Sequence, residues 1–149
     1  KLADYAAEKQ ILLCIENQVL REESLRKVYG SNAAEWLQIR QDVDRANVFL
    51  TLDSSHAATS VAIYESAAER ASRLFDFLQH PEWIGRVHWS DSRITNNESC
   101  CNDMHLVPGQ GDLPREFHQA IKQLPVIKLL EQRCSEEEVI AGLSFIESL

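Results

Sequence analysis

Several kinds of residue are scarce in this chain of 149 residues, and each scarcity excludes a class of protein. Five glycines and four prolines are too few for a disordered or low-complexity chain. No apolar run approaches the roughly 18 to 20 residues that a membrane-spanning helix needs, and no basic stretch followed by an apolar one marks a signal peptide. The cysteines are too few and too irregularly spaced for a disulfide framework: Cys14, Cys100, Cys101 and Cys134. We therefore expect a cytoplasmic protein without a membrane partner.

Positive charge is also in short supply. The chain has 15 basic and 23 acidic side chains, which gives a formal net charge of −8. This balance disfavours loose, charge-driven binding to DNA. The apolar fraction of 44% is enough for a buried core, and the length fits one domain spanning residues 1–149.

What is present is a repeated pattern, in which a short apolar run ends at a carboxylate or a histidine and a helical stretch follows. Continuous apolar runs are typical of strands covered on both faces, as in parallel sheets. The polar residues recur every 35 to 43 positions, and one strand with its crossover helix needs roughly 30 residues or more. The runs are residues 11–15 before Glu16, 48–52 before Asp53, 86–87 before His88 and 126–130 before Glu131.

The stretches between these runs have helical spacing of apolar residues. We predict helices over 2–9, 32–44 and 60–79, another from about Pro114, and a last one that begins after Ser135. Ser135 is followed by three glutamates, which suit the first turn of a helix because the helix dipole favours negative charge there. His80 and His118 lie in or beside helical stretches without a partner nearby in the sequence, so we expect both on the surface.

Residues 90–112 are polar and contain Pro108, Gly109 and Gly111 without any helical or strand period. A loop of this length in a compact domain usually has a function. Four strands alternating with helices indicate an α/β fold with a parallel sheet. A complete (β/α)₈ barrel needs about 250 residues, so we expect the C-terminal half of a TIM barrel, with about four βα units. Half a barrel has unpaired sheet edges, so the missing N-terminal half or a second copy of the chain would be needed to close it.

The four polar residues at the strand ends form the candidate site. In a parallel barrel the C-terminal ends of the strands converge on one face, where barrel enzymes place their active sites. A single carboxylate at a strand end is ordinarily a helix cap or a solvated loop residue, but four in register favour a common role. Three carboxylates and an imidazole would repel one another or lose solvation unless a cation neutralised them. We expect a divalent metal, zinc first and manganese or magnesium as alternatives, and no other cofactor.

Three further residues lie close to this pattern. His56 follows Asp53 by three positions, and we expect the loop between them to turn both side chains toward one site. Asp103 and His105 form an Asp-x-His pair in the long loop, where alternate residues of an extended segment point the same way.

The segments around these residues read LCIEN, LTLDSSHA, VHWSDSR, NDMHLVPGQGDLP and LLEQ. Together they resemble the xylose isomerase-like TIM barrels, and within that superfamily endonuclease IV, which is apurinic/apyrimidinic endonuclease family 2. The resemblance covers nearly the whole chain. It implies that seven residues are metal ligands: Glu16, Asp53, His56, His88, Asp103, His105 and Glu131.

The resemblance to endonuclease IV implies a hydrolase that cleaves a phosphodiester of abasic-site DNA with metal-activated water. Glu16 and Glu131 would be the catalytic residues that orient the attacking hydroxide. One metal position would use Glu16, Asp53, His88 and Glu131, and a second His56, Asp103 and His105. The chain departs from the family pattern at Gln132-Arg133, where Thr-Pro is usual, and at Asn17-Gln18.

The alternative comes from the same superfamily, namely the sugar isomerases and epimerases. Members of that group use one divalent metal, and the glutamates at the positions of Glu16 and Glu131 transfer a proton beside a carbonyl group. They usually lack the Asp-x-His pair, so Asp103 and His105 favour the hydrolase, whereas the net charge favours the isomerase. A small sugar would then replace abasic DNA as the partner. A third reading is a half-barrel fragment that is inactive by itself.

Overall fold

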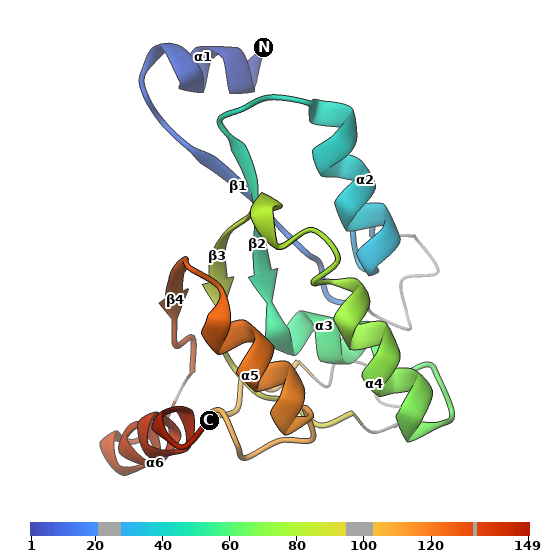
Figure 1. Cartoon of the computed structure of the whole chain (residues 1–149), viewed down its shortest axis with the longest axis vertical. Coiled ribbons are helices and arrows are strands. Elements are labelled where there is room, and N and C mark those ends of the chain that lie inside the picture. Colours follow the sequence, from blue (N-terminus) through green and yellow to red (C-terminus); the bar gives the residue numbers. More distant parts are fainter. Residues whose placement is uncertain (21–27, 95–102, 133) are drawn as a thin grey trace.

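The computed structural model describes residues 1–20, 28–94, 103–132 and 134–149. In these ranges four strands form one sheet in the order β1-β2-β3-β4, and every neighbouring pair is parallel (Figure 1). All four strands therefore end at the same edge. Their bounds are Leu13–Glu16 for β1, Val48–Asp53 for β2, Ile84–His88 for β3 and Ile127–Leu129 for β4.

Helices alternate with these strands, as the repeated pattern predicts. In the part of the chain that the structure describes, no helix is both long and apolar enough to span a membrane. The helices are α1 (Leu2–Glu8), α2 (Ala33–Val43), α3 (Ser54–Val61), α4 (Ala67–Asp76), α5 (Arg115–Gln123) and α6 (Glu136–Glu147), with a short 3₁₀ turn, η1, at Pro81–Trp83.

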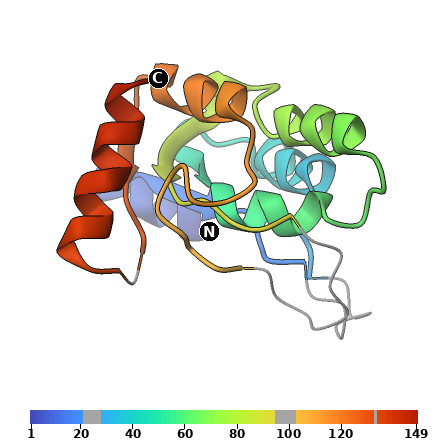
Figure 2. The ribbon, with the colours of Figure 1, turned by 90° about the horizontal axis from the view of Figure 1, so that it is seen from below.

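The hydrophobic core lies between the sheet and the helices that cover one of its faces. Leu50 and Leu52 of β2 are fully buried there against aromatic side chains such as Trp36 of α2 and Phe117 of α5. The Trp36 indole also donates a hydrogen bond of 2.9 Å to the backbone carbonyl of Ile15 in β1. Figure 2 shows these helices gathered on one side of the sheet, with α6 at one end of the molecule, where it packs against α5.

The opposite face of the sheet is open. The strand register aligns Glu16 with Thr51, Thr51 with Arg86 and Arg86 with Ile127, so these residues share that face. Arg86 is exposed, and Ile127 keeps 65% of its surface accessible. A complete barrel would enclose this face, so the sheet has the form expected of half a barrel.

One helix prediction is wrong. The stretch 60–79 is not one helix, because α3 ends at Val61 and α4 begins only at Ala67. Each has its own cap: the Asp53 carboxylate accepts the backbone N–H of His56, and the Ser66 hydroxyl accepts that of Glu69. The loop expected between Asp53 and His56 is therefore the first turn of α3. The predicted cap of the last helix is confirmed, since Ser135 and Glu138 form a capping box.

Candidate metal centre

The four strand-end residues lie together at the C-terminal edge of the sheet. One ligand atom from each lies within 4.8 Å of the others, and we call this set the strand-end cluster: Glu16, Asp53, His88 and Glu131. The Nδ1 atom of His88 lies 2.7 Å from Glu131 Oε2, 3.0 Å from Glu16 Oε1 and 3.7 Å from Asp53 Oδ2. The sheet register accounts for part of this geometry, because Asp53 and His88 are direct neighbours on paired strands.

Asp53 is the buried member of this cluster, with no exposed surface. Its Oδ1 atom caps α3, whereas its Oδ2 atom has no hydrogen-bond partner among the described residues. Burial raises the pKa of Asp53 because desolvation penalises the charged form. An orphaned carboxylate oxygen that faces an imidazole and two more carboxylates fits a divalent cation.

Asn17 fixes the relative position of the first two strand ends, and the sequence analysis did not assign it this role. Its side chain donates to the backbone carbonyl of Asp53 at 3.0 Å and accepts the backbone N–H of Asp53 at 2.7 Å. The backbone carbonyl of Asn17 lies 2.7 Å from Nδ1 of His56. Only its place directly after Glu16 could have suggested this function.

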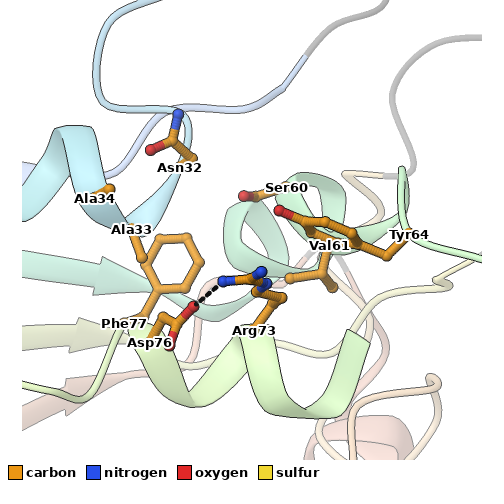
Figure 3. Close-up of a pocket in the computed structure, with 9 residues that line it drawn as sticks. All are labelled: Asn32, Ala33, Ala34, Ser60, Val61, Tyr64, Arg73, Asp76 and Phe77. Carbon is orange, nitrogen blue, oxygen red and sulfur yellow. Dashed lines mark hydrogen bonds and ion pairs between the residues drawn. The ribbon is translucent and has the colours of Figure 1, made fainter. Parts of the chain in front are cut away.

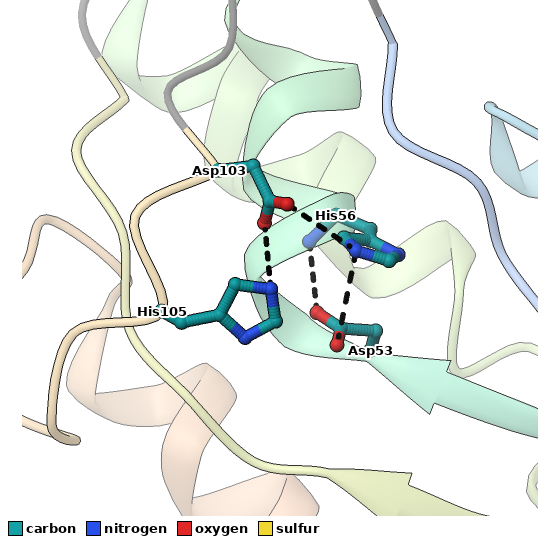
Figure 4. Close-up of side chains that lie close together, drawn as sticks. All are labelled: Asp53, His56, Asp103 and His105. Atoms are coloured by element: carbon teal, nitrogen blue, oxygen red, sulfur yellow. Dashed lines mark hydrogen bonds and ion pairs between the residues drawn. The ribbon is translucent and has the colours of Figure 1, made fainter. Parts of the chain in front are cut away.

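A second group shares Asp53 with the first and extends toward the long loop. One ligand atom from each of its members again lies within 4.8 Å of the others, and we call it the loop-side cluster: Asp53, His56, Asp103 and His105. The Asp103 carboxylate lies between the two rings, 3.1 Å from Nε2 of His105 and 3.5 Å from Nε2 of His56 (Figure 4). The helix α3 and the loop thus supply opposite sides of this cluster.

In the loop-side cluster, the carboxylates stabilise the charged form of the imidazoles, and the imidazoles stabilise the charged form of Asp103. Burial would lower the pKa of His56, but the hydrogen bond with Asp103 and the charge of Asp53 outweigh it and raise that pKa to about 9. The bond with Asp103 likewise raises the pKa of His105 to about 9, despite partial burial. Burial would raise the pKa of Asp103, yet its bonds with the two imidazoles hold it far below the ordinary value. A cation bound here would have to displace protons from both rings.

A buried network around Asp91 holds the loop that supplies Asp103 and His105. The Asp91 carboxylate accepts backbone N–H groups from Ser92 at 2.8 Å, Gly109 at 3.0 Å and Leu113 at 3.1 Å. The backbones of Asp91 and Leu106 exchange two hydrogen bonds of 2.7 and 2.8 Å. Leu106 directly follows His105, so this network sets where His105 stands.

His118 completes the network, and the expectation that it lies on the surface is wrong. It is fully buried, with Nε2 3.2 Å from Asp91 and Nδ1 accepting the Trp89 indole N–H at 2.9 Å. Because an indole can only donate, Nδ1 of His118 is the acceptor, and the ring carries its proton on Nε2. This N–H donates a hydrogen bond to the Asp91 carboxylate. Burial would raise the pKa of Asp91, but the His118 bond and the backbone N–H groups lower it. His80, by contrast, has a half-exposed side chain.

A hollow beside the two clusters offers room for a small molecule. It has a volume of about 680 Å³ and is lined by Asp103, Met104, His105, Leu130, Glu131 and Gln132. Binding sites for small molecules commonly have volumes of about 300–1,000 Å³. Cys100 and Cys101 lie outside the described residues.

The seven residues selected from the sequence are thus all brought to one edge of the sheet. They form two tetrads that overlap at Asp53. Their role as metal ligands remains a prediction.

Comparison with known proteins gives a family and a fold. The family described as "xylose isomerase-like TIM barrel" matches residues 1–149. Among solved structures, the chain is similar to a D-tagatose 3-epimerase-like protein, with 20% identity and a TM-score of 0.68 over 98% of this chain and 49% of that one. It is also similar to the 3-keto-D-glucoside 4-epimerase YcjR from E. coli, with 17% identity and a TM-score of 0.61 over 99% and 50%.

A third similar structure is the D-psicose 3-epimerase from Clostridium cellulolyticum H10, with 16% identity and a TM-score of 0.59 over 98% of this chain and 52% of that one. The chain therefore spans about half the length of these structures. No curated protein matches it. At such low identities the likeness establishes the fold, which is that of a partial TIM barrel.

Proposed function

Because the chain belongs to the xylose isomerase-like TIM barrel family, we propose that it is part of a divalent-metal-dependent sugar isomerase or epimerase. The observation that supports this most is the strand-end cluster, where two accessible glutamates flank a buried aspartate and a histidine. The similar solved structures are named as sugar epimerases, which favours this activity over that of endonuclease IV.

The strand-end cluster would hold the metal through Glu16, Asp53, His88 and Glu131. Mixed oxygen and nitrogen ligands suit zinc or manganese, and magnesium is a further candidate. When bound, the metal would polarise the oxygens of a sugar and acidify the carbon beside its carbonyl group.

The two glutamates would transfer the proton. Glu16 is the last residue of β1 and Glu131 lies two residues beyond β4, so they approach His88 from the two opposite edges of the sheet. Asp53 has no exposed surface, whereas Glu131 has a side chain that is 51% exposed and lines the hollow. Asp53 and His88 would therefore anchor the site, while one glutamate removes a proton from the sugar carbon and the other returns one.

A second candidate is the metal-dependent hydrolase of the endonuclease IV kind. The specific observation in its favour is the loop-side cluster, which offers three ligands beyond the strand-end cluster and so allows a second metal. Two metals a few ångströms apart suit phosphodiester cleavage, with Glu16 and Glu131 orienting the attacking water. The net charge of −8 counts against a DNA substrate.

Metal stoichiometry separates the two candidates. We would measure the metal content of the purified chain by elemental analysis, beside an Asp103→Ala/His105→Ala variant. One metal per chain that the variant retains supports the isomerase. Two metals, one of which the variant loses, support the hydrolase. A chain that binds no metal contradicts both.

Proton exchange tests the chemistry directly. The metal-loaded chain is incubated with ketohexoses in D₂O, and deuterium beside the carbonyl is followed by NMR. Glu131→Gln retains an oxygen ligand but removes the base, so exchange should fall by about 10²-fold or more. Cleavage of abasic DNA without any exchange would favour the hydrolase instead.

The open face of the sheet also needs a partner. We infer that half a barrel of the same kind covers it, supplied either by an N-terminal half or by a second copy of the chain. Exposed Ile127 and Leu129 on edge strand β4 support this, because an uncovered apolar edge promotes association. Sedimentation of the chain alone distinguishes a dimer from a monomer.

A further inference from the structure

A second, smaller pocket lies away from both clusters, in the helical layer (Figure 3). It is bounded by the start of α2, the end of α3 and the C-terminal end of α4, and has a volume of about 120 Å³. Its lining residues are Asn32, Ala33, Ala34, Ser60, Val61, Tyr64, Arg73, Asp76 and Phe77. None of these belongs to the strand-end or loop-side cluster.

Ser60 presents an unused polar group to this pocket. Only 6% of the residue is exposed, and the hydrogen bonds among the described residues include none to its hydroxyl. Figure 3 shows the hydroxyl directed into the space between the three helices. A hydroxyl that is directed into a pocket and forms no hydrogen bond with the protein can donate its proton to a ligand there.

Arg73 brings positive charge to the opposite wall. One of its nitrogens lies 3.4 Å from Asp76, and its guanidinium stands 5.4 Å from the centre of the Tyr64 ring. A guanidinium has five N–H donors, so this single long contact leaves most of them available. Asp76 shares its charge further, because it also accepts a hydrogen bond from Gln79 at 3.0 Å.

The first turn of α2 forms the third wall. Asn32 caps the helix by accepting the backbone N–H of Glu35 at 2.9 Å. The backbone N–H groups of Ala33 and Ala34 belong to the turn that has no intrahelical acceptor, and both residues line the pocket. The start of an 11-residue helix also has a partial positive charge.

We propose that this pocket binds a small oxyanion of the phosphate class, either free phosphate or the phosphate group of a phosphorylated sugar. A hydroxyl, a guanidinium and a helix start all line the same space, and each can donate hydrogen bonds to a tetrahedral oxyanion. The volume equals that of about four water molecules, enough for a phosphate group but not for a sugar ring as well. The proposal is independent of the metal chemistry.

The test is a titration of the metal-free chain with inorganic phosphate at constant ionic strength, followed by calorimetry. Removal of metals keeps phosphate from binding at the strand-end cluster. Wild type should show saturable binding, weakened at least tenfold in Arg73→Met and several-fold in Ser60→Ala. Asp76→Asn should tighten binding, because it removes the one carboxylate in the pocket.

Arg45→Met is the matched control, because it removes the same charge outside the pocket. Arg45 forms an exposed ion pair with Asp4. Thermal unfolding confirms that each variant is folded. Absence of saturable binding in wild type, or equal losses in Arg73→Met and Arg45→Met, overturns the proposal. With the site established, a hexose phosphate that binds tenfold tighter than inorganic phosphate identifies a phosphorylated sugar, and equal affinities identify free phosphate.

Discussion

The strand-end and loop-side clusters share Asp53 but depend on different parts of the fold. The strand-end cluster stands on the ends of paired strands, where the register of the sheet fixes its geometry. The loop-side cluster combines the first turn of α3 with Asp103 and His105 on a loop. That loop is held by the buried hydrogen bonds of Asp91 rather than by the sheet. The first site therefore depends on strand pairing, and the second on a polar network that one substitution can remove.

Asp53→Asn should have the largest effect, because it removes a ligand that both clusters share. Asparagine can still cap α3, but it removes the negative charge from the point where the clusters meet. We expect metal content to fall to near zero, measured by elemental analysis. The free energy of unfolding of the metal-free chain should hold or rise, because a desolvated carboxylate is replaced by a neutral amide. A variant that keeps its full metal content would contradict the shared role of Asp53.

Asp91→Asn should separate the clusters. An amide cannot accept all the N–H groups that converge on the Asp91 carboxylate, so the network breaks and the chain loses about 3 kcal/mol of stability. We expect the pKa of His105 to fall from about 9 toward its ordinary value, measured by NMR titration of the metal-free chain. The strand-end cluster should retain its metal affinity, measured by metal titration.

Asp112→Asn is the control for this variant, because Asp112 lies in the same loop but is exposed and pairs with Arg93. It should leave both the pKa of His105 and the metal affinity of the strand-end cluster unchanged. Loss of metal affinity at the strand-end cluster in Asp91→Asn would mean that Asp91 supports the whole fold rather than the loop.

The pH dependence of stability should reveal the loop-side cluster in the metal-free chain. The pKa values of His56 and His105 are raised from 6.5 to about 9, so the stability they contribute is complete below pH 6.5 and is lost as the pH rises through 9. We expect a decrease on the order of 2 kcal/mol, measured by denaturant unfolding. His56→Gln/His105→Gln should flatten the profile, and an unchanged slope would contradict the assignment.

Ser135→Ala should have the smallest effect and should leave both clusters unchanged. It removes the capping box of α6, which lies outside both clusters, at a cost of about 1 kcal/mol. Thermal unfolding should record this loss with no change in metal stoichiometry. A coincident loss of metal would show that metal content follows overall stability, which would weaken the interpretation of the other variants.

The strand ends were predictable from the sequence because each apolar run stops at a polar residue. Glu16, Asp53 and His88 stand at the last positions of β1, β2 and β3, and Glu131 stands two residues beyond β4. The alternating parallel arrangement then follows from the length of the intervening stretches. The place of the loop-side residues was only suggested by the short spacing between Asp53 and His56 and between Asp103 and His105.

The helix α3 and the Asp91 network could not be predicted from local pattern. Residues 54–60 are small and mostly polar, so no apolar period announces a helix, and the Asp53 cap together with burial of nearly the whole segment decides its structure. His118 meets Trp89 and Asp91 across 29 and 27 positions of chain. The local spacing of apolar residues around His118 cannot indicate such long-range contacts.

Because β2 continues directly into α3, insertions and deletions are restricted at this position of the chain. Asp53 ends the strand and Ser54 begins the helix, so this corner has no connecting residue to lengthen or shorten. An insertion there would shift a helix cap and a member of both clusters together. The connections that follow β1 and β3 are many residues longer, and insertions are accommodated best in exposed loops. Changes in length among related chains are therefore expected in exposed positions of the connections after β1 and β3 that lie outside the Asp91 network, while the β2–α3 corner keeps a constant length.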